Sequence, residues 1–387
     1  MGEWKKVKLK EVLTEVTERN KDEKVKNVLS VTNSQGFVKQ DEYFEGTVHS
    51  QNISNYKIIR KNQFAYNPSR VNVGSIDILK TYDEGVLSPM YVVFKVDNSK
   101  LLPEYFRYYF QTHRFAENVK NNTQGSVRNS LSFKALASFE YLLPSIEEQI
   151  KIVKILEKVD LIIKKYEKLL EEKNQFIKSQ FVEMFENCNH KKVEIKTISE
   201  IRGRVGWKGY TKSDLRTSGP LVLGATHLTD DGLIDLSEPV FLSREKYEES
   251  PEIMIEQNDI IFAQRGSLGK VGLVKENIGE ATINPCVLII RPNGINPEFL
   301  RFLLIMEYYN GNLERLNSGS TIPMITQKTI GGYKIMLPSD DLQNKFARIA
   351  QLVDMQKQKI EEQRGNYVNL KKGLMQQLLT GKIRIKI

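Results

Sequence analysis

Apolar residues recur at spacings of three and four over two long stretches of the chain, which is the pattern of a helix with one buried seam. The seam of the first stretch consists of Ile152, Leu156, Val159, Ile163, Tyr166, Leu170, Ile177 and Met184, with Lys173 and Gln180 as interruptions. The seam of the second consists of Phe346, Ile349, Val353, Ile360, Tyr367, Leu370 and Leu374. Each stretch therefore predicts a long helix, and a helix of the first length would extend roughly 55 Å.

Capping signals set the ends of these predicted helices. Ser145 with Glu148 three residues later has the form of a capping box, and 187–189 is a polar segment that ends the first helix. Ser339 is the cap of the second helix, and Gly381 closes it. We therefore place the helices at 145–187 and within 339–387.

The two helices belong to an internal repeat. Leu143-Pro144-Ser145 with Gln149 returns 194 positions later as Leu337-Pro338-Ser339 with Gln343. Near the start of each copy the spacing falls to 186, so insertions and deletions lie in the first half of each unit. A unit of this length is a whole domain, because solenoid repeats are only a few tens of residues long. Two such copies can pair around a pseudo-twofold axis, as a homodimer does.

Short apolar runs separated by turns fill the rest of each copy. Examples are 91–94 and 287–290, and this mixture of short strands and helices predicts a small α+β domain. The boundaries are then 1–144 for the first domain, 145–187 for the central helix, 188–338 for the second domain and 339–387 for the last helix. Each predicted helix is longer than its own domain requires, so we expect the two helices to pair antiparallel and to separate the domains. The alternative is that each helix packs only on the core of its own domain.

The charge of the chain favours an anionic partner. The 387 residues include 57 Lys and Arg against 48 Asp and Glu, a net charge of +9. The sequence has no signal peptide and no apolar stretch that could span a membrane, so we expect a cytoplasmic protein. Cys188 and Cys286 occupy non-equivalent places in the two copies, and neither a disulfide framework nor a metal site is expected.

Motifs for catalysis are missing from the sequence. Asn67-Pro68-Ser69 and Asn284-Pro285-Cys286 lack the second proline and the aromatic residue of the loop that grips a flipped base in amino-methyltransferases. The Gly269-Lys270 pair lacks the glycine that a P-loop would have at position 264. No residue is therefore assigned a catalytic role, and no cofactor is expected on this chain.

Several loops instead combine basic, amide, hydroxyl and glycine residues. Arg and Lys can bind guanine, Asn and Gln can bind adenine, and Gly-Ser stretches allow backbone N–H groups to approach phosphates. The alternative is that these are solvated surface turns. The loops supply the following candidates for DNA binding: Asn33, Ser34, Gln35, Asn67, Ser69, Arg70, Asn72, Arg204, Trp207, Lys208, Thr226, His227, Arg265, Ser267 and Lys270.

The layout and these loops resemble the specificity subunit of type I restriction-modification systems. The resemblance covers essentially the whole chain as variable domain, long helix, variable domain, long helix. Asn67-Pro68-Ser69-Arg70 with Gly74-Ser75 is similar to one group of target-recognition domains in that family, and 203–209 with Gly224-Ala225-Thr226 is similar to another.

The resemblance implies a non-catalytic subunit whose two recognition domains each read one half of a bipartite DNA site. The helices would set the spacer and dock two methylation subunits, to which restriction subunits can be added. Those partners would methylate adenine at N6 with S-adenosylmethionine, which this chain itself would not bind. Because the two domains look different in type, the target would be asymmetric.

Two other classes of function remain open at this point. A duplicated DNA-processing enzyme would carry its own active site, and turnover by the isolated chain would reveal it. A helical adaptor would use the long helices only to join protein partners, and its complexes would show no DNA sequence preference.

Overall fold

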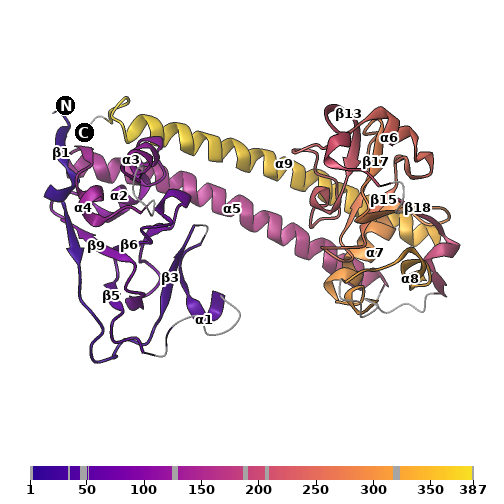
Figure 1. Cartoon of the computed structure of the whole chain (residues 1–387), viewed down its shortest axis with the longest axis horizontal. Coiled ribbons are helices and arrows are strands. Elements are labelled where there is room, and N and C mark those ends of the chain that lie inside the picture. The colour runs from indigo at the N-terminus through magenta and orange to yellow at the C-terminus, as the bar shows by residue number, and fades with distance from the viewer. Residues whose placement is uncertain are drawn as a thin grey trace. The chain divides into compact units, whose positions relative to one another are not determined.

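The computed structural model divides into two compact units. One comprises Met1–Glu167 with Glu362–Ile387, and the other comprises Lys168–Glu361. Each unit therefore contains one globular domain and one half of each long helix (Figure 1). The structure describes residues 3–33, 35–43, 50, 52–123, 130–185, 191–204, 209–316 and 323–385.

Short strands and helices alternate in the first unit. Its strands are β1 (Lys5–Lys8), β2 (Leu13–Val16), β3 (Leu29–Thr32), β4 (Gly36–Lys39), β5 (Lys57–Arg60), β6 (Phe64–Tyr66), β7 (Ile76–Ile78), β8 (Glu84–Leu87), β9 (Val92–Val96) and β10 (Glu140–Leu143). Its helices are η1 (Leu9–Glu11), α1 (Gln40–Tyr43), η2 (Val71–Val73), α2 (Pro103–Tyr109), α3 (His113–Thr123) and α4 (Phe133–Ala137). The long helix α5 (Ile146–Phe185) follows and continues into the second unit.

The second unit repeats this alternation. Its strands are β11 (Lys191–Glu194), β12 (Ser199–Gly203), β13 (Leu215–Leu223), β14 (Phe241–Leu242), β15 (Ile260–Ala263), β16 (Val271–Leu273), β17 (Ala281–Ile283), β18 (Val287–Pro292) and β19 (Lys334–Leu337). Its helices are η3 (Ile195–Thr197), η5 (Lys212–Asp214), η6 (Ala225–His227), α6 (Arg244–Glu248), η7 (Pro251–Ile253), α7 (Pro297–Tyr309), η8 (Glu314–Leu316) and α8 (Gln327–Gly331), followed by the long helix α9 (Asp340–Leu378).

The four-stranded sheets of the two units have the same strand order. The first has a four-stranded sheet in the order β2-β9-β6-β7, and the second has β12-β18-β15-β16. A two-stranded ladder joins the start of each domain to its end, with Lys5 opposite Leu143 and Lys191 opposite Leu337. The internal repeat predicted from the sequence is therefore confirmed at the level of strand order, and so is the α+β class.

Each long helix contributes apolar side chains to a domain core. In the first unit Ile152 and Leu156 are fully buried beside the aromatic cluster that includes Phe106. In the second unit Phe185 packs against Phe346, with ring centroids 5.6 Å apart. Burial of this much aromatic and aliphatic surface is the main favourable term that holds each half-helix to its domain.

Within each unit the two half-helices run antiparallel. In the first unit Asp160 of α5 pairs with Lys371 of α9 at 2.7 Å, and the Tyr166 and Tyr367 rings lie 5.7 Å apart. Residue numbers therefore increase along α5 in the direction in which they decrease along α9. This confirms the predicted antiparallel arrangement. One residue of the predicted buried seam is not buried, because Leu370 is 48% exposed. No helix in the described part of the chain is long and apolar enough to cross a membrane.

A buried glutamine ties each long helix to its domain. Gln149 accepts from the backbone N–H of Leu102 at 2.8 Å and donates to the carbonyl of Pro144 at 3.0 Å. Gln343 makes the matching bonds to Asn296 at 2.8 Å and Pro338 at 2.9 Å. This contact gives a physical reason for the glutamine that follows each Leu-Pro-Ser segment.

The predicted capping box at the start of α5 is only half formed. The Ser145 hydroxyl accepts from the backbone N–H of Glu148 at 3.3 Å. The Glu148 carboxylate, however, accepts from Trp4 at 2.9 Å and from Arg384 at 2.7 and 2.8 Å. Burial raises the pKa of Glu148, but these hydrogen bonds outweigh it and hold the pKa below the usual 4.5. The carboxylate therefore clamps the two ends of the chain instead of capping the helix.

Replacing either buried glutamine should destabilise its own unit. Gln149→Ala and Gln343→Ala should each cost about 1–3 kcal/mol for every buried backbone group that loses its partner. Urea unfolding with hydrogen exchange by peptide would measure the loss and localise it. Gln351→Ala, at an exposed position on α9, is the matched control. An unfolding free energy equal to that of the control would contradict this role.

Candidate nucleic-acid interface

Two hairpin loops lie at the same place in the repeated sheet. The first hairpin loop, residues 67–75, joins β6 to β7, and the second, residues 264–270, joins β15 to β16. Each contains, next to its last residue, a glycine with positive φ: Gly74 at 92° and Gly269 at 80°. A glycine is needed at such a position because other residues are strained there. The sequence identified both loops by composition, and the structure shows that they are equivalent.

In the first hairpin loop a local turn is stabilised by a side chain, and several polar side chains are exposed. The Asn67 side-chain oxygen accepts from the backbone N–H of Ser69 at 3.1 Å, and its amide nitrogen lies 3.8 Å from the sulfur of Met90. Ser69, Arg70 and Asn72 are exposed. A guanidinium presented in this way is free to bind a base edge or a phosphate.

The turn between β3 and β4 lies beside the first hairpin loop. The Ser75 hydroxyl donates to the carbonyl of Val31 at 2.7 Å. A Cβ on Gly74 would lie 3.7 Å from the Cβ of Asn33. Asn33 and Gln35 are exposed, whereas Ser34 lies outside the described residues. The structure thus brings together two candidate groups separated by more than thirty positions in the sequence.

In the second hairpin loop Arg265 and Ser267 are exposed. The guanidinium of Arg265 donates to the sulfur of Met324 at 3.0 Å. Gly266 has a φ of 77° with open space around it. Lys270 is different, because it is half-buried and its ammonium lies 2.8 Å from a carboxylate oxygen of Asp230.

Two candidates from the second domain lie in the interior of their unit. The guanidinium of Arg204 donates to the carbonyl of Ile283 at 2.9 Å and to the hydroxyl of Thr282 at 3.0 Å, and burial lowers its pKa. His227 is 6% exposed, and its Nδ1 accepts from the backbone N–H of Gly224 at 3.0 Å. In this structure both side chains brace loops and are not presented at the surface.

The remaining candidates in this unit differ in position. Thr226 is exposed on η6, next to the buried His227. Trp207 and Lys208 lie outside the described residues. Which of these side chains touch DNA therefore stays a prediction.

The structure also indicates two polar groups that are not among the candidates for DNA binding. The side chain of Gln264 donates to the carbonyl of Pro285 at 2.8 Å, which joins the second hairpin loop to the turn after β17. A Cβ on Gly224 would lie 2.3 Å from the amide nitrogen of Asn284, so the turn before η6 is close to the same place. Asn284 directly follows a buried strand, and this position in the sequence could have identified it as a candidate.

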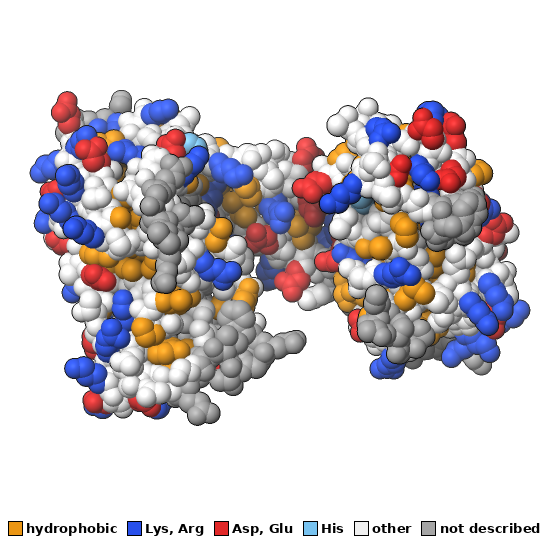
Figure 2. Space-filling view, in the orientation of Figure 1, with side chains coloured by type: hydrophobic (Ala, Val, Ile, Leu, Met, Phe, Trp, Pro, Cys, Tyr) orange, Lys and Arg blue, Asp and Glu red, His pale blue; other side chains and the backbone are white. Residues whose placement is uncertain are grey.

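Charge alone does not mark the interface. On the face drawn in Figure 2, Lys and Arg side chains are spread over both units and interspersed with Asp and Glu side chains. Among the residues that the structure describes, no group of three or more His, Cys, Asp or Glu is placed to hold a metal ion. Cys188 and His190 lie outside that part of the chain.

Comparison with known proteins decides the family. The model of the type I restriction modification DNA specificity domain matches this chain twice, over residues 1–174 and 189–370. The chain belongs to this family. As a DNA specificity subunit of the type I restriction-modification kind, it has two recognition domains, and the two matches coincide with the internal repeat.

Two curated relatives agree with this assignment. The MjaVIII specificity subunit of Methanocaldococcus jannaschii is 27% identical over 336 residues, which cover 81% of this chain and 77% of that one. The putative MjaX specificity subunit of the same organism is 24% identical and covers 99% of this chain and 94% of that one.

Two solved structures share the fold at low identity. The S subunit of the type I system from M. genitalium has a TM-score of 0.54 at 15% identity, with 97% of this chain and 96% of that chain covered. A chain from work on complex assembly and conformational transition of the type I R-M system also has a TM-score of 0.54, at 14% identity and 98% coverage of both chains.

The exposed and buried arginines should behave differently when truncated. Arg70→Ala and Arg265→Ala should each weaken specific DNA binding by about 1–3 kcal/mol through a lost base contact, while leaving the unfolding free energy nearly unchanged. Arg204→Ala should instead lower the stability of the second unit, because buried acceptors lose their donor.

Competition binding and urea unfolding on the same set of variants would separate the two effects. Arg348→Ala on the exposed surface of α9 removes the same charge and serves as the control. Equal losses of DNA affinity for Arg348→Ala and for the two loop variants would contradict a base contact.

Proposed function

We propose that each domain of this specificity subunit reads one half of a bipartite DNA target through its hairpin loop and the turns beside it. The supporting observation is that the two hairpin loops occupy the same place in a repeated framework. Their side chains carry the chemistry of base readout, because arginine pairs with guanine and amides pair with adenine. A shared framework with exchangeable loops is a suitable design for recognising different sequences.

The two half-sites differ in sequence. The first hairpin loop presents Asn67, Ser69, Arg70 and Asn72, whereas the second presents Arg265 and Ser267. A symmetric pair of identical readers would recognise a palindrome. Two different readers recognise an asymmetric target, separated by a spacer that is set by the long helices.

The chemical step belongs to partner subunits. This chain lacks the sequence motifs of an amino-methyltransferase. The methylation subunits bind S-adenosylmethionine, flip the target adenine out of the duplex and methylate N6. The role of this chain is to choose the adenine, and restriction subunits act on the same assembly.

The long helices offer the same apolar anchor twice. Leu161 of α5 is 55% exposed, and Met355, 194 positions later on α9, is 67% exposed. Phe176 and Leu370 are also 194 positions apart and are 47% and 48% exposed. A single exposed apolar residue is ordinary, but here the exposure recurs at equivalent positions of both helices. Their repetition supports two copies of one methylation subunit.

Mapping of methylated adenine in the host genome tests the reading role. With the gene intact we expect one asymmetric bipartite motif, and with the gene deleted that motif should lose its methylation. Arg70→Ala should relax the motif at one half and Arg265→Ala at the other. A palindromic motif, or relaxation of both halves by each variant, would contradict two separate readers.

Co-expression with a methylation subunit tests the partner role. The complex should hold two methylation subunits by native mass spectrometry, and Leu161→Asp or Met355→Asp should each reduce that number to one. Gln356→Asp, exposed on α9 and changing the charge by the same −1, is the control for added negative charge. The purified chain alone should transfer no methyl group from S-adenosylmethionine, and transfer at the rate of the complex would show that it is an enzyme.

A further inference from the structure

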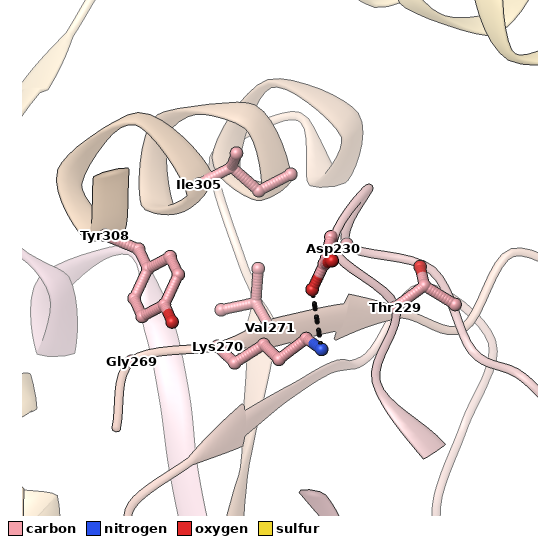
Figure 3. A pocket seen from close by; sticks show the side chains of 8 residues that line it. Thr229, Asp230, Gly269, Lys270, Val271, Ile305 and Tyr308 are labelled. Carbon is pink, nitrogen blue, oxygen red and sulfur yellow. Dashed lines mark ion pairs between the residues drawn. The ribbon is translucent and has the colours of Figure 1, made fainter. Parts of the chain in front are cut away.

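An acidic residue holds the last residue of the second hairpin loop. Figure 3 shows the Lys270 side chain extended towards Asp230, and the ammonium lies 2.8 Å from the carboxylate oxygen. The Lys270 side chain is only 22% exposed, whereas that of Asp230 is 83% exposed. The cavity beside them, about 10 Å³, is too small for a small-molecule ligand. The pair is therefore a contact between two loops at the protein surface.

The turn that carries Asp230 is fixed to the body of its unit. Asp231 forms an ion pair with Lys357 of α9, and its carbonyl accepts from the buried Arg301 of α7 at 3.1 Å. Gly232 follows with a φ of 71°, and a Cβ there would lie 2.6 Å from Ile305. The backbone of the turn is consequently held in place, and the exposed Asp230 side chain extends from it beside Lys270.

The first hairpin loop has a different arrangement at the equivalent position. Ser75 stands where Lys270 stands in the second loop, after the positive-φ glycine, and its hydroxyl donates to Val31 at 2.7 Å. The ion pair is therefore a feature of the second domain and not of the shared framework.

We propose that Asp230 is a specificity-determining residue that restrains Lys270 from binding DNA of the wrong sequence. This inference rests on the proposed function, in which the second hairpin loop contacts DNA. Non-specific binding consists almost entirely of contacts between basic side chains and phosphates, and each neutralised phosphate adds to its salt dependence. A lysine already paired with a carboxylate contributes little to such binding. The carboxylate also repels a phosphate that approaches it.

Correct base contacts change this balance. When the loop residues Arg265 and Ser267 engage their half-site, the duplex is held with a phosphate near Lys270. An ion pair of this exposure contributes at most about 1 kcal/mol, so a phosphate that the base contacts hold in place can displace the carboxylate, whereas a phosphate without such contacts has to compete with it. Lys270 therefore contacts a phosphate on the target sequence and stays paired with Asp230 on other sequences.

The test uses the complex with methylation subunits and two duplexes of equal length, one with the mapped target and one without it. Asp230→Asn should raise affinity for the non-target duplex by about two- to fivefold, and should steepen its log K against log salt by about 0.9. Affinity for the target should change less, so the ratio between the duplexes falls. Glu276→Gln, an exposed acid in the same unit, controls for the added charge.

Two further variants separate this inference from the function on which it rests. Lys270→Gln should weaken binding to the target, and in Lys270→Gln/Asp230→Asn the gain on non-target DNA should disappear. If Lys270→Gln leaves both duplexes unaffected, the loop does not contact DNA there and the proposed function fails at this residue. If Lys270→Gln weakens binding but Asp230→Asn matches Glu276→Gln, the role of Asp230 alone is overturned.

Discussion

The amide side chain of Gln149, like that of Gln343 in the second copy, bonds to the segment before a domain helix and to the proline carbonyl before a long helix. One side chain thus satisfies buried groups on two elements, and neither element can shift without leaving a donor or acceptor unpaired. The start of each long helix is thereby fixed on its own domain. This junction therefore sets how the domain, including its hairpin loop, is oriented relative to the start of its long helix.

The same junction shows how a repeated framework diverges while its geometry is kept. Asp160 accepts from Tyr108 at 2.8 Å and pairs with Lys371 in the first unit. Its equivalent in the second unit, Asp354, pairs with Arg301 and with Lys275 at 2.6 Å. Removal of one member from such a partly buried network leaves a charge without compensation, which is costly. The carboxylate is therefore retained while its partners change, and the loops are free to change further.

The repeat, the α+β class and the long helices could be predicted because their signals are local or periodic. The heptad spacing of Ile152, Leu156 and Val159 requires no knowledge of distant residues, and a shared offset identifies two equal domains. The hairpin loops were also recognisable, because composition marks a turn rich in arginine, amide and glycine. In these cases the residues that decide the structure are neighbours in sequence.

Side-chain roles that depend on distant partners could not be predicted in the same way. Arg204 reads as a DNA ligand in its loop, yet its acceptors lie 78 and 79 positions away at Thr282 and Ile283. Glu148 fits a capping box, but the folded chain offers it Arg384 from 236 positions away. A buried cation or carboxylate binds whichever partner the tertiary structure supplies, and one sequence does not reveal that partner.

The clamp between Trp4, Glu148 and Arg384 bears on how the chain folds during synthesis. The core of the first unit includes Met375, Leu378 and Leu379, and its contacts are completed by 362–385. Proteins usually fold from the N-terminus as they leave the ribosome. The first unit is built from two separate segments, 1–167 and 362–387, whereas the second unit is one continuous segment, 168–361. All the residues of the second unit are therefore synthesised before the last residues that complete the core of the first unit.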